Sequence, residues 1–230
     1  AFKAVYATYG KFRNTFASTL SGNVKRDNVH ARIRNYSSAR EAALSDDHIP
    51  EAVYDQLVET VNNNLHLLQR YVALRKEVLG LDQVHMYDMY TPLVKEVKME
   101  IPYDKATGMM LEGLNALGEE YVGIVKNGID NRWVDVKENK GKRSGAYSSG
   151  AYGTNPYILM NWQDNVDNLF TLAHEFGHSV HSHYTRESQP FVYGDYSMVS
   201  VQAAAQHLHD IISLIGTTED LQASIALNTY

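Results

Sequence analysis

The stretch His174-Glu175-Phe176-Gly177-His178 places two imidazoles and a carboxylate within five residues. On a helix, residues i and i+4 project from one face about 6 Å apart, so His174 and His178 can bind the same ion. Glu175 lies beside them. A carboxylate next to a metal-bound water can accept that water's proton, and zinc lowers the pKa of the water to about 7. The stretch therefore predicts a hydrolytic metal site of the metallopeptidase kind.

The flanking residues indicate a helix that packs against a core. Asp164 is expected to cap the start of this helix. One apolar stripe follows at helical spacing: Leu169, Ala173, Phe176 and Val180. The histidines lie just off this stripe, where a cleft is expected. Gly177 costs about 1 kcal/mol relative to alanine in a helix, so we expect it to let another segment approach closely. The alternative is a chance match on an ordinary helix.

The composition indicates a globular protein of one large or two small domains, with 230 residues of which 44% are hydrophobic. The net charge is -6, and no run of Lys and Arg is long enough to neutralise a phosphate backbone. We therefore expect no nucleic-acid partner. The short basic stretch at residues 140–143 lies among glycines, and is interpreted as a solvated loop or at most a contact for an anionic substrate group.

The chain contains no cysteine, which leaves His and carboxylate side chains to bind any metal. This composition fits a reducing compartment, and we expect a cytoplasmic protein. No stretch approaches 18 apolar residues and no signal-peptide pattern is found, so no membrane span is expected. The first residues already follow a helical pattern and the last segment ends without a recognisable stop, so we expect a fragment of a longer chain.

Apolar periodicity predicts four helices before the histidine motif. The first is expected to begin at Phe2, to pack through one apolar face, and to end at Gly22. Pro50 suits the first turn of the longest helix, which is expected to end at Gly80. The other two are predicted over residues 38–44 and from Asp104, as N-cap, to about residue 126.

The pattern changes to β structure before the histidine motif. Residues 133–136 alternate, and residues 156–160 have the pattern of a buried strand. The segment between them is rich in glycine. A strand with small residues lets another backbone come close, so an extended peptide could add to its edge. The alternative is a plain glycine-rich hairpin without a ligand.

A further helix is expected to begin near Ser197, after a break at residues 186–190. A catalytic zinc site needs three protein ligands and an open position for water. The third ligand is expected on this helix.

Together these stretches resemble the oligoendopeptidase F group of the thimet-oligopeptidase-like zinc peptidases. The resemblance rests mainly on GKRSGAYSSG (141–150), YGTNPYI (152–158), FTLAHEFGHS (170–179) and QPFVYGDY (189–196). It extends upstream through residues 20–25, 79–82 and 118–121, and covers roughly residues 1–200. Several independent stretches in the same order are more specific than the five-residue motif alone.

This resemblance implies a mainly α fold, in which a zincin-like catalytic region has a small β-sheet next to the metal helix. Residues 1–130 would form a helical region lining a channel, and residues 131–230 the catalytic region, within one continuous domain truncated at both ends. The substrates would be short peptides rather than folded proteins.

The resemblance also assigns roles to single residues. His174 and His178 would bind one zinc ion, and Glu175 would be the general base that activates water. Gly145 and Ala146 match the family's strand that holds the substrate backbone.

The sequence departs from the family at the third zinc ligand. The family has Glu at the position twenty-eight residues after the first His, and this chain has Gln202. A Gln carbonyl can coordinate zinc but carries no charge, so the site should hold zinc less tightly. The residues beyond Gln202 also depart from the family, and its late Tyr and His residues, which hydrogen-bond the oxyanion, are not found.

Two hypotheses therefore stand: an active zinc metalloendopeptidase, or a catalytically impaired or inactive peptide-binding relative. His207, His209 and Asp210 are candidate ligands only if the register of their helix differs from the family's. Asp195 is expected either to orient a ligand histidine from the second coordination shell or to cap the helix near Ser197.

Overall fold

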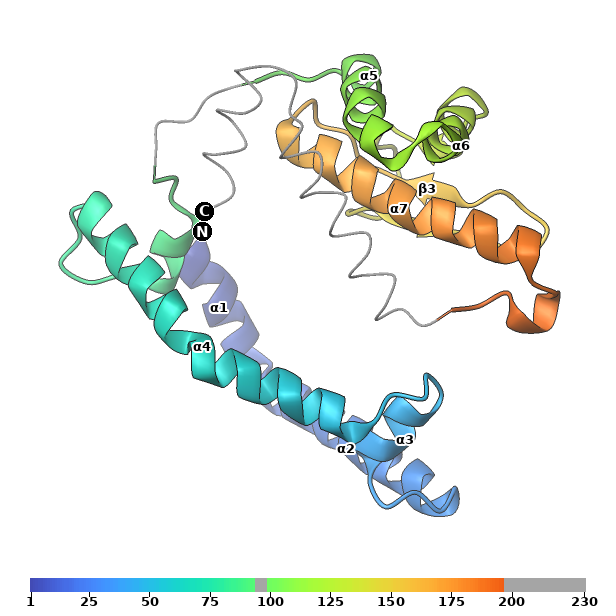
Figure 1. Cartoon of the computed structure of the whole chain (residues 1–230). Coiled ribbons are helices and arrows are strands. Elements are labelled where there is room, and N and C mark those ends of the chain that lie inside the picture. The colour runs from blue at the N-terminus through green and yellow to red at the C-terminus, as the bar shows by residue number, and fades with distance from the viewer. Residues whose placement is uncertain (94–98, 197–230) are drawn as a thin grey trace. The chain divides into compact units, whose positions relative to one another are not determined.

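The computed structural model describes residues 1–93 and 99–196, and the chain divides into two compact units, residues 1–93 and 94–230 (Figure 1). The described part is mainly helical and contains a three-stranded sheet, as predicted. The expected helix near Ser197 and the candidate ligand Gln202 lie outside the described residues. The functional division of the chain at residue 130 stays a prediction.

Unit 1 is built from helices. Its elements are α1 (Phe2–Lys11), α2 (Arg13–Ile33), α3 (Ala39–Ser45), α4 (Glu51–Val78) and the 3-10 helix η1 (Met86–Tyr90). The predicted short helix and the long helix that begins after Pro50 are confirmed. The side chain of Ser38 caps α3 by accepting a hydrogen bond from the backbone N–H of Glu41 at 2.9 Å.

The N-terminal helix begins at Phe2 as predicted, but it differs from its prediction in the middle of the apolar run and after its end. The helix breaks at Phe12, where φ is -105° and ψ is 15°, so α1 and α2 are separate helices. In turn, α2 continues through Gly22 to Ile33. One glycine weakens a helix by only about 1 kcal/mol. The polar residues after Gly22 are tolerated in the helix because they face solvent. For the same reason the apolar period stops there, although the helix continues.

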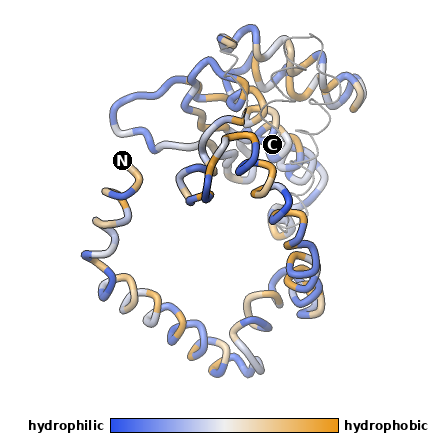
Figure 2. Tube along the Cα trace, turned by 90° about the vertical axis from the view of Figure 1, so that its left-hand side faces the viewer, coloured by the Kyte–Doolittle hydropathy of each residue, from blue (hydrophilic) through white to orange (hydrophobic). Residues whose placement is uncertain are grey.

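The apolar side chains of α1, α2 and α4 are largely exposed in unit 1, which corrects the expectation of a packed N-terminal helix. Val5 is 49% exposed and Phe16 is 48% exposed. Apolar residues recur along these helices (Figure 2). The buried residues among positions 1–93 are Ala31 and Arg75. An apolar stripe forms a core only where another element covers it, and within unit 1 the helices meet mainly at α3.

Unit 2 contains the sheet and the histidine motif. Its described elements are α5 (Tyr103–Gly113), η2 (Leu114–Leu117), α6 (Glu119–Asp130), β1 (Val134–Asp135), β2 (Tyr147–Ser149), β3 (Tyr157–Leu159), α7 (Val166–Ser188) and η3 (Phe191–Tyr193). The helix predicted from Asp104 starts one residue earlier, after Pro102 as N-cap, and Asp104 lies in its first turn. It is also interrupted at Gly118, whose φ of 93° no helix accommodates.

The sheet has the strand order β1-β3-β2. The strands β1 and β3 are parallel, with Val134 opposite Ile158. The strands β2 and β3 are antiparallel, with Tyr147 opposite Leu159 and Ser149 opposite Tyr157. Both predicted strand segments are therefore present, and β2 forms one edge of the sheet.

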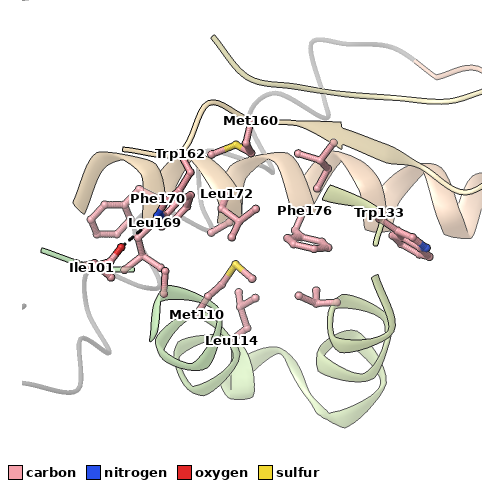
Figure 3. Packing of buried hydrophobic residues seen from close by; sticks show 14 of the residues in the cluster. Ile101, Met110, Leu114, Trp133, Met160, Trp162, Leu169, Phe170, Leu172 and Phe176 are labelled. Atoms are coloured by element: carbon pink, nitrogen blue, oxygen red, sulfur yellow. Dashed lines mark hydrogen bonds between the residues drawn. The ribbon is translucent and has the colours of Figure 1, made fainter. Parts of the chain in front are cut away.

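Helix α7 lies between this sheet and the helices α5 and α6, and it contacts all of them. Its predicted apolar stripe is buried, because Leu169, Ala173, Phe176 and Val180 are each at most 2% exposed. Side chains of α7 point toward Met110 and Leu114 (Figure 3). A buried stripe of this length fixes the rotation of α7, and with it the direction of the histidines.

The start of α7 corrects the predicted cap. Asn165, not Asp164, is the N-cap, and its side chain accepts a hydrogen bond from the backbone N–H of Asn168 at 2.9 Å. Asp164 adopts a φ of 53°, and its carboxylate accepts a hydrogen bond from the indole N–H of Trp162 at 3.0 Å. The carboxylate is therefore engaged by the core tryptophan, and the next residue caps the helix.

Gly128 marks the closest approach of α6 to the core. A β-carbon at this position would lie 2.7 Å from the indole of Trp133 and 2.9 Å from the ring of Phe176. Glycine is therefore required here for packing, since its φ is not positive.

Candidate active site

The two histidines of the motif face one another on α7. The Nε2 atoms of His174 and His178 are 3.2 Å apart, and their ring centroids are 4.9 Å apart. His178 is buried at 9% exposure and His174 is half-buried. The helix therefore brings the two predicted ligands together with the same ring nitrogen of each directed to one point.

This donor pair fits a zinc ion. Zinc binds imidazole nitrogen at about 2.0–2.1 Å, and two ligands of a tetrahedral ion then lie about 3.3 Å apart. The observed separation of 3.2 Å between the two Nε2 atoms meets this requirement without movement of α7. Among residues 1–93 and 99–196, no group of three His, Cys, Asp or Glu side chains could hold a metal ion. The predicted third ligand, Gln202, lies outside that part of the chain.

Glu175 lies on the sheet side of α7 and is buried at 7% exposure. Burial raises the pKa of the Glu175 carboxyl, and a hydrogen bond from the backbone N–H of Ser148 partly opposes this rise. A carboxylate with a raised pKa accepts a proton more readily than an exposed one. The environment of Glu175 therefore suits the general base that the sequence predicts.

Ser148 also joins β2 to α7 through its side chain. Its hydroxyl is 2.8 Å from the hydroxyl of Ser179, which is fully buried. One residue of β2 therefore contacts both the predicted base and the helix that carries it. This pair is not predictable from the sequence, because isolated serines give no signal until the register of β2 against α7 is known.

The free edge of β2 lies on the same side as Glu175. In an antiparallel ladder, successive residues turn their N–H and C=O groups alternately toward and away from the partner strand. Ile158, opposite Ser148, donates its N–H to Trp133 on the β1 side, so Ser148 turns away from β3. Its hydrogen bond to Glu175 agrees with this direction. Continuing the alternation by two residues gives Ala146 the same outward orientation.

Gly145 and Ala146, the predicted substrate-binding residues, directly precede β2 and line a pocket of about 770 Å³. Its other walls come from the loop before β2, from the segment after β3 and from the first turns of α7, including Thr171. Thr171 lies one helical turn before His174. The predicted substrate strand, the base and the histidines therefore belong to one region of unit 2.

The segment after α7 returns to the same helix. The hydroxyl of Tyr196 is 2.6 Å from that of Ser182, and its ring lies 4.1 Å from the ring of His181. Partial desolvation lowers the pKa of His181, although much of its surface is exposed. Asp195 is exposed between η3 and Tyr196, and its role as an orienting carboxylate stays a prediction.

None of the helices in the described residues is long and apolar enough to cross a membrane.

The chain is similar to several known oligopeptidases. The chain is 65% identical over 205 residues to oligopeptidase PepF of Bacillus subtilis. The matched region covers 89% of this chain and 31% of that protein. It is 51% identical to the group B oligopeptidase PepB of Streptococcus agalactiae, covering 100% of this chain and 39% of the relative. The crystal structure of oligoendopeptidase F from Enterococcus faecium superposes with a TM-score of 0.62 at 36% identity, over 97% of this chain and 33% of that one.

The model of peptidase family M3 matches residues 1–214. The chain belongs to peptidase family M3, which confirms the resemblance drawn from the sequence. It spans about a third of the length of the curated relatives described above.

Proposed function

We propose that the protein is a zinc metalloendopeptidase that hydrolyses peptide bonds in short oligopeptides. One observation carries this proposal: two histidine Nε2 atoms lie 3.2 Å apart on a helix whose buried Glu175 contacts the edge of a β-strand. The similarity to oligopeptidases supports the substrate class.

His174 and His178 would hold one zinc ion, with Gln202 as the proposed third ligand. When bound, zinc supplies Lewis acidity, which polarises a carbonyl and lowers the pKa of water. The contribution of α7 is to hold the two imidazoles at a fixed separation, because its apolar stripe is buried in the core. The site then needs little reorganisation to bind the ion.

Glu175 would accept a proton from the attacking water and deliver it to the leaving amine. Its raised pKa suits both halves of this transfer, since the carboxyl can hold the proton between the two steps. The hydrogen bond from the backbone of Ser148 orients the carboxylate toward the edge of β2.

An extended peptide would pair with the outward C=O group of Ser148 and with the N–H and C=O groups of the preceding Ala146, since the N–H of Ser148 is bonded to Glu175. This pairing depends on the main chain, so it accepts many sequences. Gly145 has no side chain to obstruct the approach of the peptide.

The test is metal analysis combined with cleavage of an internally quenched oligopeptide. We expect stoichiometric zinc, loss of cleavage on chelation, and recovery when zinc is returned. Glu175→Gln should lower kcat by about 10²- to 10⁴-fold while zinc content is retained. Unchanged cleavage in Glu175→Gln, or a protein that takes up no zinc, would show that the mechanism is wrong.

A second candidate is a peptide-binding protein with impaired or lost catalysis, which the presence of Gln202 in place of the family's Glu favours. Calorimetry that detects peptide binding without turnover in excess zinc would support it. Turnover gained in Gln202→Glu would instead identify a peptidase whose metal site is weakened by one missing charge.

A further inference from the structure

Asn161 lies two residues beyond β3, at the point where the antiparallel ladder with β2 stops. Tyr147 faces Leu159 in the register, so Asn161 faces Gly145 two residues further along. The backbone of Gly145 has a φ of 92°, in the left-handed region, and the regular strand ends there.

The side chain of Asn161 makes hydrogen bonds in place of the backbone ladder, which stops at this point. Its amide nitrogen donates hydrogen bonds to the carbonyl oxygens of Gly145 at 2.8 Å and of Arg143 at 2.9 Å. One amide group can make both bonds because it carries two N–H donors. Asn161 therefore fixes the two carbonyls that precede Ala146.

A second contact fixes the start of the same segment. The ammonium group of Lys142, whose side chain is 4% exposed, donates to the carbonyl oxygens of Asp135 at 2.9 Å and Lys137 at 2.6 Å. The segment 142–146 is thus attached to β1 at one end and to the chain beyond β3 at the other. Between these anchors lies Gly145, whose backbone is otherwise free to adopt many conformations.

Asn161 also lines the pocket of about 770 Å³ together with Gly145 and Ala146. From these contacts we infer that Asn161 is a positioning residue, which holds the segment 143–146 as the template for the main chain of an extended peptide. This inference rests on the proposed function, because it assigns the peptide to the edge that includes Ala146.

The alternative is that Asn161 only stabilises the hairpin. The two roles differ in what they change: loss of a template weakens peptide binding, whereas loss of hairpin stability lowers the fraction of folded, active protein. A template role therefore raises KM with little change in kcat, and a purely structural role lowers kcat at unchanged KM.

Asn161→Asp is the principal variant, since it keeps the size of the side chain and replaces the donor by an acceptor facing two carbonyls. Asn161→Ser, which keeps one donor on a shorter side chain, serves if Asn161→Asp fails to fold. Asn131→Asp is the matched control, because Asn131 donates its amide to the carbonyl of Asn127 at 3.0 Å on the exposed end of α6.

The first measurement is steady-state cleavage of an internally quenched oligopeptide by the full-length protein. We expect KM to rise about tenfold in Asn161→Asp, the effect of losing two ordinary hydrogen bonds, with kcat within about twofold. The control should match the parent. Unchanged KM, or a fall in kcat alone, would overturn the inference.

The second measurement is calorimetric binding of the same peptide to variants that also carry Glu175→Gln, so that it does not depend on cleavage. In the Glu175→Gln protein that retains Asn161, N-methylation of a peptide amide that pairs with the edge of β2 should weaken binding. The same methylation should weaken binding clearly less when Asn161→Asp is also present. Equal losses in both would contradict the template role. Binding with this pattern, combined with no cleavage by the protein that retains Glu175, would contradict the proposed function alone.

Discussion

The helices of the two units carry similar apolar patterns but have different surroundings. Phe16 on α2 is 48% exposed, whereas Phe176 on α7 is fully buried. The sheet and the helices α5 and α6 cover α7, while α1, α2 and α4 contact other elements of their unit mainly at α3. Periodicity along a chain therefore indicates a helix, but whether its apolar face is buried depends on elements from other parts of the sequence.

The largest expected contrast is the truncation of one phenylalanine in each unit. Phe176→Ala should lower the free energy of unfolding by about 3–5 kcal/mol, because it removes a fully buried ring from the core. Phe16→Ala should cost less than about 1 kcal/mol. Both tryptophans of the chain, Trp133 and Trp162, are buried in unit 2, so denaturation followed by their fluorescence reports on that unit.

The second measurement for this pair is circular dichroism, which follows the helices of both units. If Phe16→Ala proves as damaging as Phe176→Ala by this probe, the exposed face of α2 is covered in solution and the contrast between the units fails.

Glycine-to-alanine substitutions should change stability in opposite directions in the two units. Gly128→Ala is expected to destabilise by about 1–3 kcal/mol, since the new methyl group would overlap Trp133 and Phe176. Gly22→Ala meets open space inside α2 and should stabilise by up to about 1 kcal/mol. Thermal denaturation of both variants beside the parent measures the two signs; a stable Gly128→Ala would mean that α6 can move away from the core.

Capping substitutions test a smaller difference. Asn165→Ala should cost about 0.5–2 kcal/mol in unit 2, because it leaves the N–H of Asn168 without its acceptor at the start of α7. Ser38→Ala removes the cap of the seven-residue helix α3 and should leave tryptophan fluorescence unchanged at equal denaturant. A shift of the fluorescence transition in Ser38→Ala would show that the two units unfold together.

The smallest expected effect is a pH dependence that comes from His181. Partial desolvation lowers the pKa of this histidine in the folded protein, so the unfolded chain is protonated first as the pH falls through about 6.5. The stability that the neutral ring contributes is present above that value and is lost as the pH falls toward the folded pKa. His181→Asn should reduce the slope of Tm against pH in this range, and an unchanged slope would contradict the assignment.

Much of unit 2 could be predicted from the sequence, because its signals are local. The stripe that ends at Val180 defines α7, and the i, i+4 spacing of His174 and His178 already implies that their side chains meet. The sequence also indicates the strands, through alternation near Val134 and a short apolar run at Ile158. These features depend on residues close together in the chain.

Most of the missed features depend on residues that are distant in the sequence. The cap of α7 is the exception, because Trp162 lies only two residues before Asp164. The hydroxyl pair of Ser148 and Ser179 forms across 31 positions, and its existence follows from packing. The carboxylate of Asp164 had two possible partners, and the indole of Trp162 outcompetes the helix start that the sequence favours. Similarly, nothing local distinguishes the exposed Phe16 from the buried Phe176.

The β2–β3 hairpin and the segment that follows it contact α7 at three levels along the helix. The carboxamide of Asn168 accepts from the N–H of Gln163 near the start, the hydroxyls of Ser148 and Ser179 meet in the middle, and the guanidinium of Arg186 donates to the carbonyl of Gly150 near the end. A helix attached at intervals has few low-energy ways to bend or shift in register. The histidine side chains therefore lose most of their conformational entropy when unit 2 folds, before any ion binds. The cost of assembling the histidine pair falls on folding rather than on binding.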